Sequence, residues 1–289
     1  MAGPRGQGAT YAASVRIVVA PDKFRGTLTA VEAAAALAAP LRAAGHEVVE
    51  VPMADGGEGF LDALGGPNRT TTVSGPLGDP VDAGWRLSSR TAVVEMARAS
   101  GLLLVDGPDG NDPVAASTYG TGELIVAALD AGARKVEVGL GGSATTDGGL
   151  GALRAMYPVQ RFRGVELVVA CDVATRFTAA AAVFGPQKGA GPAQVALLER
   201  RLERLLEVYA HDYGVDLAEV DGAGAAGGLA GGLVCAGARL ASGVDLVADL
   251  VGLEDAVEEA DLVVTGEGLL DVESFDGKVV GGVAGIAMS

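Results

Sequence analysis

The sequence predicts an α/β protein of two domains, and three observations carry this prediction. A β-branched run at residues 16–20, an alanine-rich helical segment and a second apolar run at 47–53 form a β-α-β unit, which implies parallel strands. From about residue 70, strands joined by Gly/Pro turns indicate an antiparallel portion. Beyond residue 120, helical segments and strands alternate again. A parallel sheet and a separate mixed sheet account for this order.

Individual elements follow from caps and periodicity. Residues 29–32 (TAVE) form a capping-box pattern, and Gly45 suits the position just past a helix. The remaining expected elements are helices at 122–131, 193–209 and 246–258 and strands at 136–140 and 165–170. Within the helix at 193–209, apolar residues recur every three or four positions. Its Arg200/Glu203 and Arg204/Glu207 spacings indicate a solvated face.

Composition excludes several classes of protein. The 289 residues are 49% hydrophobic, which suffices for a large core, and the net charge of -16 disfavours a nucleic-acid or anionic-membrane partner. We expect no membrane association, and we leave open whether the chain forms a homodimer. Two cysteines indicate a reducing interior, and residues 1–14 resemble a disordered lead-in with no signal peptide. We therefore expect a cytoplasmic protein.

Three of the four lysines lie in short loops beside glycine or proline: Lys23 in PDKFRG, Lys188 in FGPQKGAG and Lys278 in FDGKVVGG. In so acidic a chain, cations gathered in loops can bind a carboxylate or a phosphate. Arg25 adds a guanidinium that can make a bidentate contact. Solvated turn lysines are the alternative for each one taken singly.

Acidic side chains follow the predicted strands. They are Asp22 after the first strand, Asp55 and Glu58 after the second, Asp147 in a glycine loop, Asp172 after VVAC, and Glu267 and Asp271 after LVVT. In open α/β sheets, ligands bind beyond the carboxyl ends of the strands, so these acids can face one crevice. Mg²⁺ beside a nucleotide needs only one or two carboxylates. A helix cap or a turn is the alternative for each aspartate.

The loop GLGGSATTDGGLG, residues 139–151, follows an apolar run and precedes a helix-compatible segment. Bare backbone with hydroxyls at Ser143, Thr145 and Thr146 suits a phosphate, whereas a tight structural turn would also use glycine. The loop alone does not separate these readings.

Familiar motifs for other reactions are missing or weak. The chain has no GxxxxGK[ST] phosphate loop and no GxSxG nucleophile elbow. A GxGxxG match at residues 222–227 follows a poor strand, and the first β-α loop is charged, which disfavours a dinucleotide-binding dehydrogenase. Glycine loop, acids and cations together suit phosphoryl transfer, which depends on positioning and charge neutralisation.

These stretches, in order, resemble the bacterial glycerate kinase family. The matching segments are IVVAPDKFRGTLTA, VPMADGGEGFLDAL, VVEMARASGLLLV, ASTYGTGELI, GLGGSATTDGG, ACDV, AAVFGPQKGA, GAGAAGGL and VVTGEGLLD. The resemblance implies a flavodoxin-like (Rossmann-like) parallel-sheet domain at 15–65 and 259–289, with a mixed α/β domain at 66–258 inserted into it. It also implies phosphorylation of D-glycerate to 2- or 3-phosphoglycerate with ATP and Mg²⁺.

The roles that we predict combine this resemblance with the positions of the residues. Lys23 and Arg25 bind the glycerate carboxylate or the transferring phosphoryl group, and Asp22 or Asp271 orients the attacking hydroxyl. Nucleotide phosphate is held by Gly141, Gly142, Ser143, Thr145, Lys188 and Lys278. The Mg²⁺ candidates are Asp55, Glu58 and Asp147.

The sequence departs from the family pattern in its late motif and its length. Leu269 stands where arginine is usual, and relatives continue well beyond the motif around Lys278, so we expect the final strands and helices of the flavodoxin-like domain to be missing. Two alternatives stay open. One is a catalytically inactive relative that binds a small hydroxy acid or nucleotide, and the other is a kinase for a different hydroxy acid.

Overall fold

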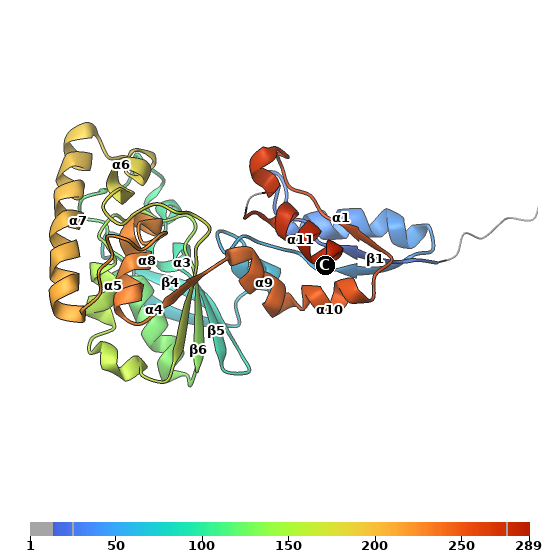
Figure 1. The fold of residues 1–289 in the computed structure, drawn as a ribbon, viewed down its shortest axis with the longest axis horizontal. Coiled ribbons are helices and arrows are strands. Elements are labelled where there is room, and N and C mark those ends of the chain that lie inside the picture. The colour runs from blue at the N-terminus through green and yellow to red at the C-terminus, as the bar shows by residue number, and fades with distance from the viewer. Residues whose placement is uncertain (1–13, 25, 276) are drawn as a thin grey trace, which may run out of the picture.

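The computed structural model describes residues 14–24, 26–275 and 277–289. Residues 1–13 of the expected lead-in and Arg25 lie outside these ranges. The elements form two groups side by side, one around a three-stranded sheet and the other around a six-stranded sheet (Figure 1). The α/β class with two sheets, one parallel and one mixed, is confirmed.

The small sheet is wholly parallel, with the order β2-β1-β9. Its strands are β1 (Arg16–Val19), β2 (Glu47–Glu50) and β9 (Leu262–Val264). Helix α1 (Ala30–Ala43) joins the first two and begins with the predicted capping box between Thr29 and Glu32. One face of β1 packs through Ile17 and Val19 against Ala34 of α1.

The other face of β1 is covered by the C-terminal helices. These are α9 (Gly243–Val251), α10 (Leu253–Glu258) and α11 (Val279–Met288), the last preceded by the 3-10 turn η4 (Val272–Phe275). Val18 lies in one apolar cluster with Val247, Leu253 and Val283. We assigned the residues of α9 and α10 to the inserted domain, and both helices pack in this cluster beside the small sheet. Leu246 of α9 also lies in a cluster with Val168 and Ala170 of the six-stranded sheet. The predicted helix at 246–258 is divided by Gly252, whose φ is +67°.

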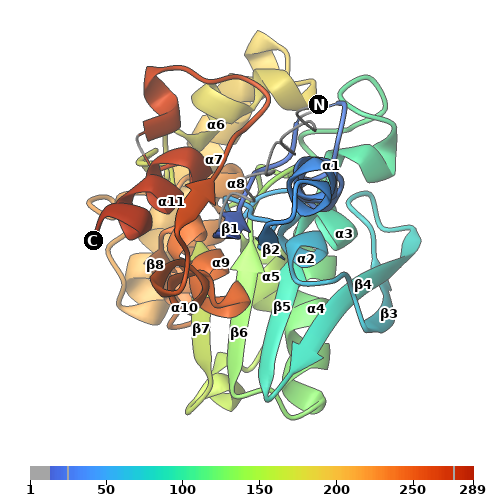
Figure 2. The same ribbon diagram turned by 90° about the vertical axis from the view of Figure 1, so that its right-hand side faces the viewer.

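The large sheet has the order β3-β4-β5-β6-β7-β8 and is antiparallel from β3 to β5 and parallel from β5 to β8. Its strands are β3 (Arg69–Ser74), β4 (Pro80–Ser88), β5 (Thr91–Glu95), β6 (Lys135–Gly139), β7 (Glu166–Ala170) and β8 (Arg239–Ala241). Figure 2 shows the parallel strands side by side. The Gly/Pro-turn pattern therefore marked the antiparallel part correctly.

Helices α4 (Tyr119–Asp130), α5 (Leu150–Ala155) and α8 (Ala225–Cys235) share one apolar core with the large sheet. Outside them lies α7 (Pro192–Tyr213), at the far left of Figure 1, with α6 (Ala180–Phe184) beside it. The shorter turns are α3 (Ala97–Ser100), η1 (Leu102–Val105), η2 (Val159–Phe162) and η3 (Pro186–Lys188). None of the helices within the described ranges combines the length and apolarity needed to cross a bilayer.

The GxGxxG match forms the irregular start of α8. Residues 226–228 have left-handed backbone angles, and a Cβ on Gly227 would lie 2.0 Å from the carbonyl oxygen of Thr145. Glycine is required there because the backbone of α8 lies against the loop at 139–151. The match therefore serves close packing and follows no sheet strand, in line with its weak sequence context.

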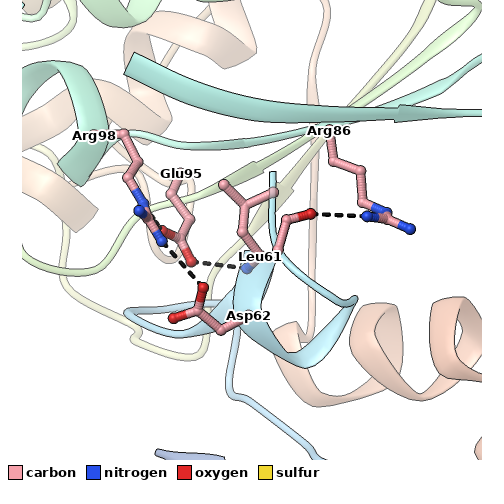
Figure 3. Close-up of polar contacts among 6 residues, drawn as sticks. Leu61, Asp62, Arg86, Glu95 and Arg98 are labelled. Atoms are coloured by element: carbon pink, nitrogen blue, oxygen red, sulfur yellow. Dashed lines mark hydrogen bonds and ion pairs between the residues drawn. The ribbon is translucent and has the colours of Figure 1, made fainter. Parts of the chain in front are cut away.

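A polar cluster fixes the segment that leads from the small sheet into the large one. Glu95, at the end of β5 and 4% exposed, accepts a hydrogen bond of 2.8 Å from the backbone N–H of Leu61 in α2 (Phe60–Ala63) (Figure 3). Arg98 donates to Glu95 at 2.8 Å and pairs with Asp62 at 3.3 Å. Arg86 donates a hydrogen bond of 2.8 Å to the carbonyl oxygen of Gly66, in the turn that follows α2. These contacts hold α2 against the large sheet.

Replacing Glu95 by alanine should lower the free energy of unfolding by about 1–3 kcal/mol, because it leaves the buried N–H of Leu61 without an acceptor and leaves Arg98 with Asp62 as its remaining partner. Chemical denaturation measures this. Glu203→Ala, at an exposed position of α7, is the control and should change stability by less than about 0.5 kcal/mol. A Glu95→Ala protein as stable as the control would show that the cluster contributes nothing.

Candidate functional site

The first cavity lies at the carboxyl ends of β1 and β9 and has a volume of about 370 Å³. We call it the lysine cavity, because Lys23 and Lys278 both line it. The amino group of Lys23 lies 3.8 Å from Asp22 Oδ1 and 3.6 Å from Asp55 Oδ1. One lysine thus lies between the aspartates that follow the first and second strands, as the strand-end pattern predicts.

Asp22 is held rigidly and is 7% exposed. Its backbone N–H donates to Gly266 at 2.9 Å, and its side chain accepts from the N–H of Lys23 at 2.7 Å. Burial raises the pKa of the Asp22 carboxyl, and the positive charge of Lys23 only partly opposes this. A carboxyl with a raised pKa beside a cation is suited to accept a proton.

The late motif supplies the rest of this cavity. Glu267, Leu269 and Asp271 line it together with Lys278, which precedes α11. The Glu267 Oε1 atom is buried without a hydrogen-bond partner. Asp271 accepts a hydrogen bond from the N–H of Ser274 at 3.1 Å. The cavity therefore combines two lysines with several acids, a mixture that suits a small ligand bearing both a carboxylate and hydroxyl groups.

The second cavity, of about 520 Å³, adjoins the glycine loop. We call it the glycine cavity. Gly141, Gly142, Ser143 and Lys188 line it, as do Gly56, Gly57, Asp172 and Phe184. Asp55 lines both this cavity and the lysine cavity. The two hollows thus share one carboxylate at the crossing between the sheets.

The glycine loop is fixed by its neighbours. Gly142 accepts a backbone hydrogen bond from Leu102 at 2.8 Å, and the N–H of Ala144 donates to Ser100 at 3.0 Å. A Cβ on Gly141 would lie 2.6 Å from the backbone nitrogen of Glu58. A side chain at position 141 would disrupt the packing of the two loops. The backbone of this wall is therefore bare because the two loops approach each other closely.

Asp172 belongs to the glycine cavity, although we assigned it no role. It accepts a hydrogen bond of 2.9 Å from the N–H of Gly243, and its outer face is open to the cavity. The surrounding protein nonetheless removes enough water to raise its pKa to about 6, and the negative charge of Asp55 adds to this. Its position after β7 is the sequence feature that could have predicted a role in the site. Glu267 has the same feature, because it follows β9.

Lys188 is the most unusual group of the glycine cavity. Its side chain is 2% exposed, its amino group donates to the carbonyl of Thr145 at 2.6 Å, and it lies 5.9 Å from the centre of the Phe184 ring. Burial lowers the pKa of this lysine to about 7, with only a partial opposing effect from Asp147. A lysine in this state gains charge readily when an anion enters the cavity.

The lowered pKa of Lys188 predicts a stability that depends on pH. The unfolded chain binds this proton with an ordinary pKa of 10.5 and the folded chain with a pKa of about 7, so the penalty is fully present below pH 7 and disappears as the pH rises towards 10.5. Between about pH 8 and 10, the free energy of unfolding should therefore rise by about 1.4 kcal/mol per pH unit relative to Lys188→Met. Urea denaturation of both proteins across this range measures the difference. Parallel pH profiles would contradict the prediction.

Two other residues of the loop, Thr145 and Asp147, lie outside the two cavities. The side chain of Thr145 is fully buried, and Thr145 does not line either cavity. The Asp147 carboxylate accepts hydrogen bonds from the N–H and hydroxyl of Thr118 and from the N–H groups of Gly149 and Gly151, at 2.9 to 3.1 Å. It therefore holds the loop and the start of α5, and it lies outside both cavities.

Glu58 is exposed and lines a third hollow, of about 290 Å³, on the α1 side of Lys23. Of the three predicted metal ligands, the structure thus brings only Asp55 to the shared wall. Among the residues described, no group of three or more His, Cys, Asp or Glu side chains could hold a metal. Magnesium bound with a nucleotide fits Asp55 and Asp172 all the same, because phosphate oxygens and water supply its other ligands.

Similar proteins identify the family of this chain. The model of the glycerate kinase family matches residues 17–157 and 158–289. A glycerate 2-kinase from Escherichia coli K12 is 38% identical over 94% of this chain and 82% of the relative. A glycerate kinase from Bacillus subtilis 168 is 40% identical over 95% of this chain and 82% of the relative.

A solved structure, described as a "putative glycerate kinase 2" from Salmonella typhimurium LT2, superposes with a TM-score of 0.85 at 38% identity. The match covers 95% of this chain and 84% of that one. The family model, these relatives and the solved structure lead to one conclusion: this chain belongs to the glycerate kinase family.

Proposed function

We propose that the protein transfers the γ-phosphoryl group of ATP to a hydroxyl of D-glycerate. The observation that carries the proposal is the shared position of Asp55, which lines both the lysine cavity and the glycine cavity. Two adjoining hollows with a common carboxylate suit a reaction that joins two ligands. The glycine cavity has the volume of a typical small-molecule site, and the lysine cavity is smaller.

In this proposal the acid occupies the lysine cavity. The glycerate carboxylate pairs with Lys23 or Lys278, and its hydroxyl faces Asp22 or Asp271. The raised pKa of Asp22 favours it as the proton acceptor. The hydroxyl oxygen forms a bond to the γ-phosphorus while the bond between that phosphorus and the β-γ bridging oxygen breaks, so that ADP leaves and the hydroxyl proton passes to the carboxylate.

The nucleotide occupies the glycine cavity in this proposal. Backbone at Gly141 and Gly142 and the hydroxyl of Ser143 contact phosphate, and Lys188 beneath them gains a proton as the anion enters. Mg²⁺ would be held by Asp55 and Asp172 and would neutralise phosphate charge when bound. The mutual repulsion of these two carboxylates, part of the raised pKa of Asp172, is consistent with a cation between them.

Release of ADP from ATP and D-glycerate in a coupled assay tests the proposal, with L-glycerate, glycolate and lactate as controls. NMR of the product distinguishes the two phosphoglycerates. Because the E. coli relative is named glycerate 2-kinase, we expect 2-phosphoglycerate. Turnover only with another hydroxy acid would contradict the proposed substrate.

The inactive alternative is supported by one feature of the lysine cavity. Leu269, 74% exposed, stands where arginine is usual in the family, and it removes a cation from the wall. Measurable binding of ATP or D-glycerate without ADP release would favour this binding protein over the kinase.

A further inference from the structure

A separate pocket lies between α5 and α7, and the proposed reaction does not use it. Its volume is about 420 Å³, and we call it the α7 pocket. None of the residues that form it lines the lysine cavity or the glycine cavity. A hollow of this size lies within the usual range for small organic ligands.

The floor of the α7 pocket is apolar. Leu150 at the start of α5 and Leu197 and Leu205 of α7 line it, and all three are only partly buried by the protein. Val114, from the loop that precedes α4, adds a fourth aliphatic side chain. A hydrocarbon or aromatic group would complete the burial of these side chains.

The rim of the pocket is cationic. Arg200, Arg201 and Arg204 line it from consecutive turns of α7, in a protein whose net charge is -16. Arg201 donates to the Val114 carbonyl at 2.8 Å, and Arg204 forms an ion pair with Glu207. Within the described part of the chain, no hydrogen bond or ion pair involves Arg200. The solvated-face interpretation of α7 is thus incomplete, because these arginines surround an apolar hollow.

Beneath the pocket lies a buried hydroxyl without a partner. Thr146 lines the pocket and is 1% exposed, yet its hydroxyl oxygen has no hydrogen-bond partner. Native proteins leave few buried polar groups in this state. Asp147 also lines the pocket, and its oxygens accept the hydrogen bonds of Thr118, Gly149 and Gly151. Its single negative charge is outweighed by the three arginines of the same pocket.

We propose that the α7 pocket binds a small organic anion with an apolar body. The anionic head pairs with Arg200 and Arg204, and the body lies on the leucines. The apolar floor disfavours inorganic anions, and the arginines disfavour neutral apolar compounds. D-Glycerate has no apolar portion, so this site is distinct from the one in the proposed function.

Calorimetric titration with octanoate tests the site. D-Glycerate and ADP are present in excess, so that they occupy the lysine cavity and the glycine cavity and exclude octanoate from both. We expect saturable binding of one octanoate with a Kd of about 1 mM or below. Acetate has only the carboxylate head, and 1-octanol has only the apolar body. Each should therefore bind at least about tenfold more weakly than octanoate. Octanoate binding no stronger than acetate binding would overturn the proposal.

A charge-matched pair of variants locates the binding. Arg200→Gln/Arg204→Gln should weaken octanoate binding at least about tenfold. Arg69→Gln/Arg163→Gln removes the same charge from exposed positions elsewhere and should leave binding within about twofold. Equal affinities in the two double variants would overturn the proposal. So would a homodimer that only Arg200→Gln/Arg204→Gln dissociates, because the pocket would then be a subunit interface.

Discussion

Replacing Lys23 by methionine should lower kcat/KM for D-glycerate by about 100- to 1,000-fold. The Lys23 amino group lies within 4 Å of both Asp22 and Asp55, and its side chain is 17% exposed. No other lysine or arginine among the described residues forms an ion pair with either aspartate. Removing this charge leaves Asp22 and Asp55 without the cation that lies between them, although Lys278 still lines the cavity. A steady-state ADP-release assay at saturating ATP measures the effect.

The pH dependence of the same variant separates catalysis from folding. Because Lys23 lowers the pKa of Asp22, its loss should raise that pKa further, so the acidic limb of the kcat/KM profile should move to higher pH. Arg163→Met, which removes an exposed cation, should keep the wild-type rate and profile. A Lys23→Met enzyme within about tenfold of wild type would contradict the assigned role.

Replacing Asp147 by alanine should lower the free energy of unfolding by about 3–4 kcal/mol. The substitution removes the acceptor for two N–H groups at the start of α5 and for the N–H and hydroxyl of Thr118, most of which are buried. Urea denaturation measures the loss. Asp109→Ala, at an exposed position, should change stability by less than about 0.5 kcal/mol.

Replacing Ser143 of the same loop by alanine should weaken ligand binding and leave the free energy of unfolding nearly unchanged. Ser143 lines the glycine cavity, so we expect ATP affinity to fall about fivefold while stability stays within about 0.5 kcal/mol. Together the two variants divide the loop into a ligand-facing half and a structural half. Equal stability losses with unchanged ATP affinity would show that the whole loop is a structural turn.

Much of the fold could be predicted because it depends on local patterns. The capping box at Thr29 places the start of α1, and alternating Gly/Pro turns distinguish β3 and β4 from the parallel strands. The division between α9 and α10 could not be predicted, because Gly252 within an apolar helical pattern gives only a weak signal. The packing of both helices on the small sheet depends on contacts far apart in the sequence.

The sequence could predict those residues of the candidate site that come shortly after strands. Asp22 and Asp55 adjoin because parallel strands end at one edge, and Lys23 follows directly. Whether an aspartate faces a cavity or the backbone depends on the fold around it. Asp147 and Asp172 look equivalent in the sequence, but only Asp172 opens onto the glycine cavity.

Because Asp55 lies in the walls of two cavities, we expect ligands in them to influence each other's binding. A ligand in either cavity can contact the same carboxylate. If occupation of the glycine cavity changes the affinity of the lysine cavity by some factor, thermodynamic reciprocity requires the same factor in the other direction. One side chain therefore links the two binding equilibria, and a substitution at Asp55 would alter the coupling as well as each affinity.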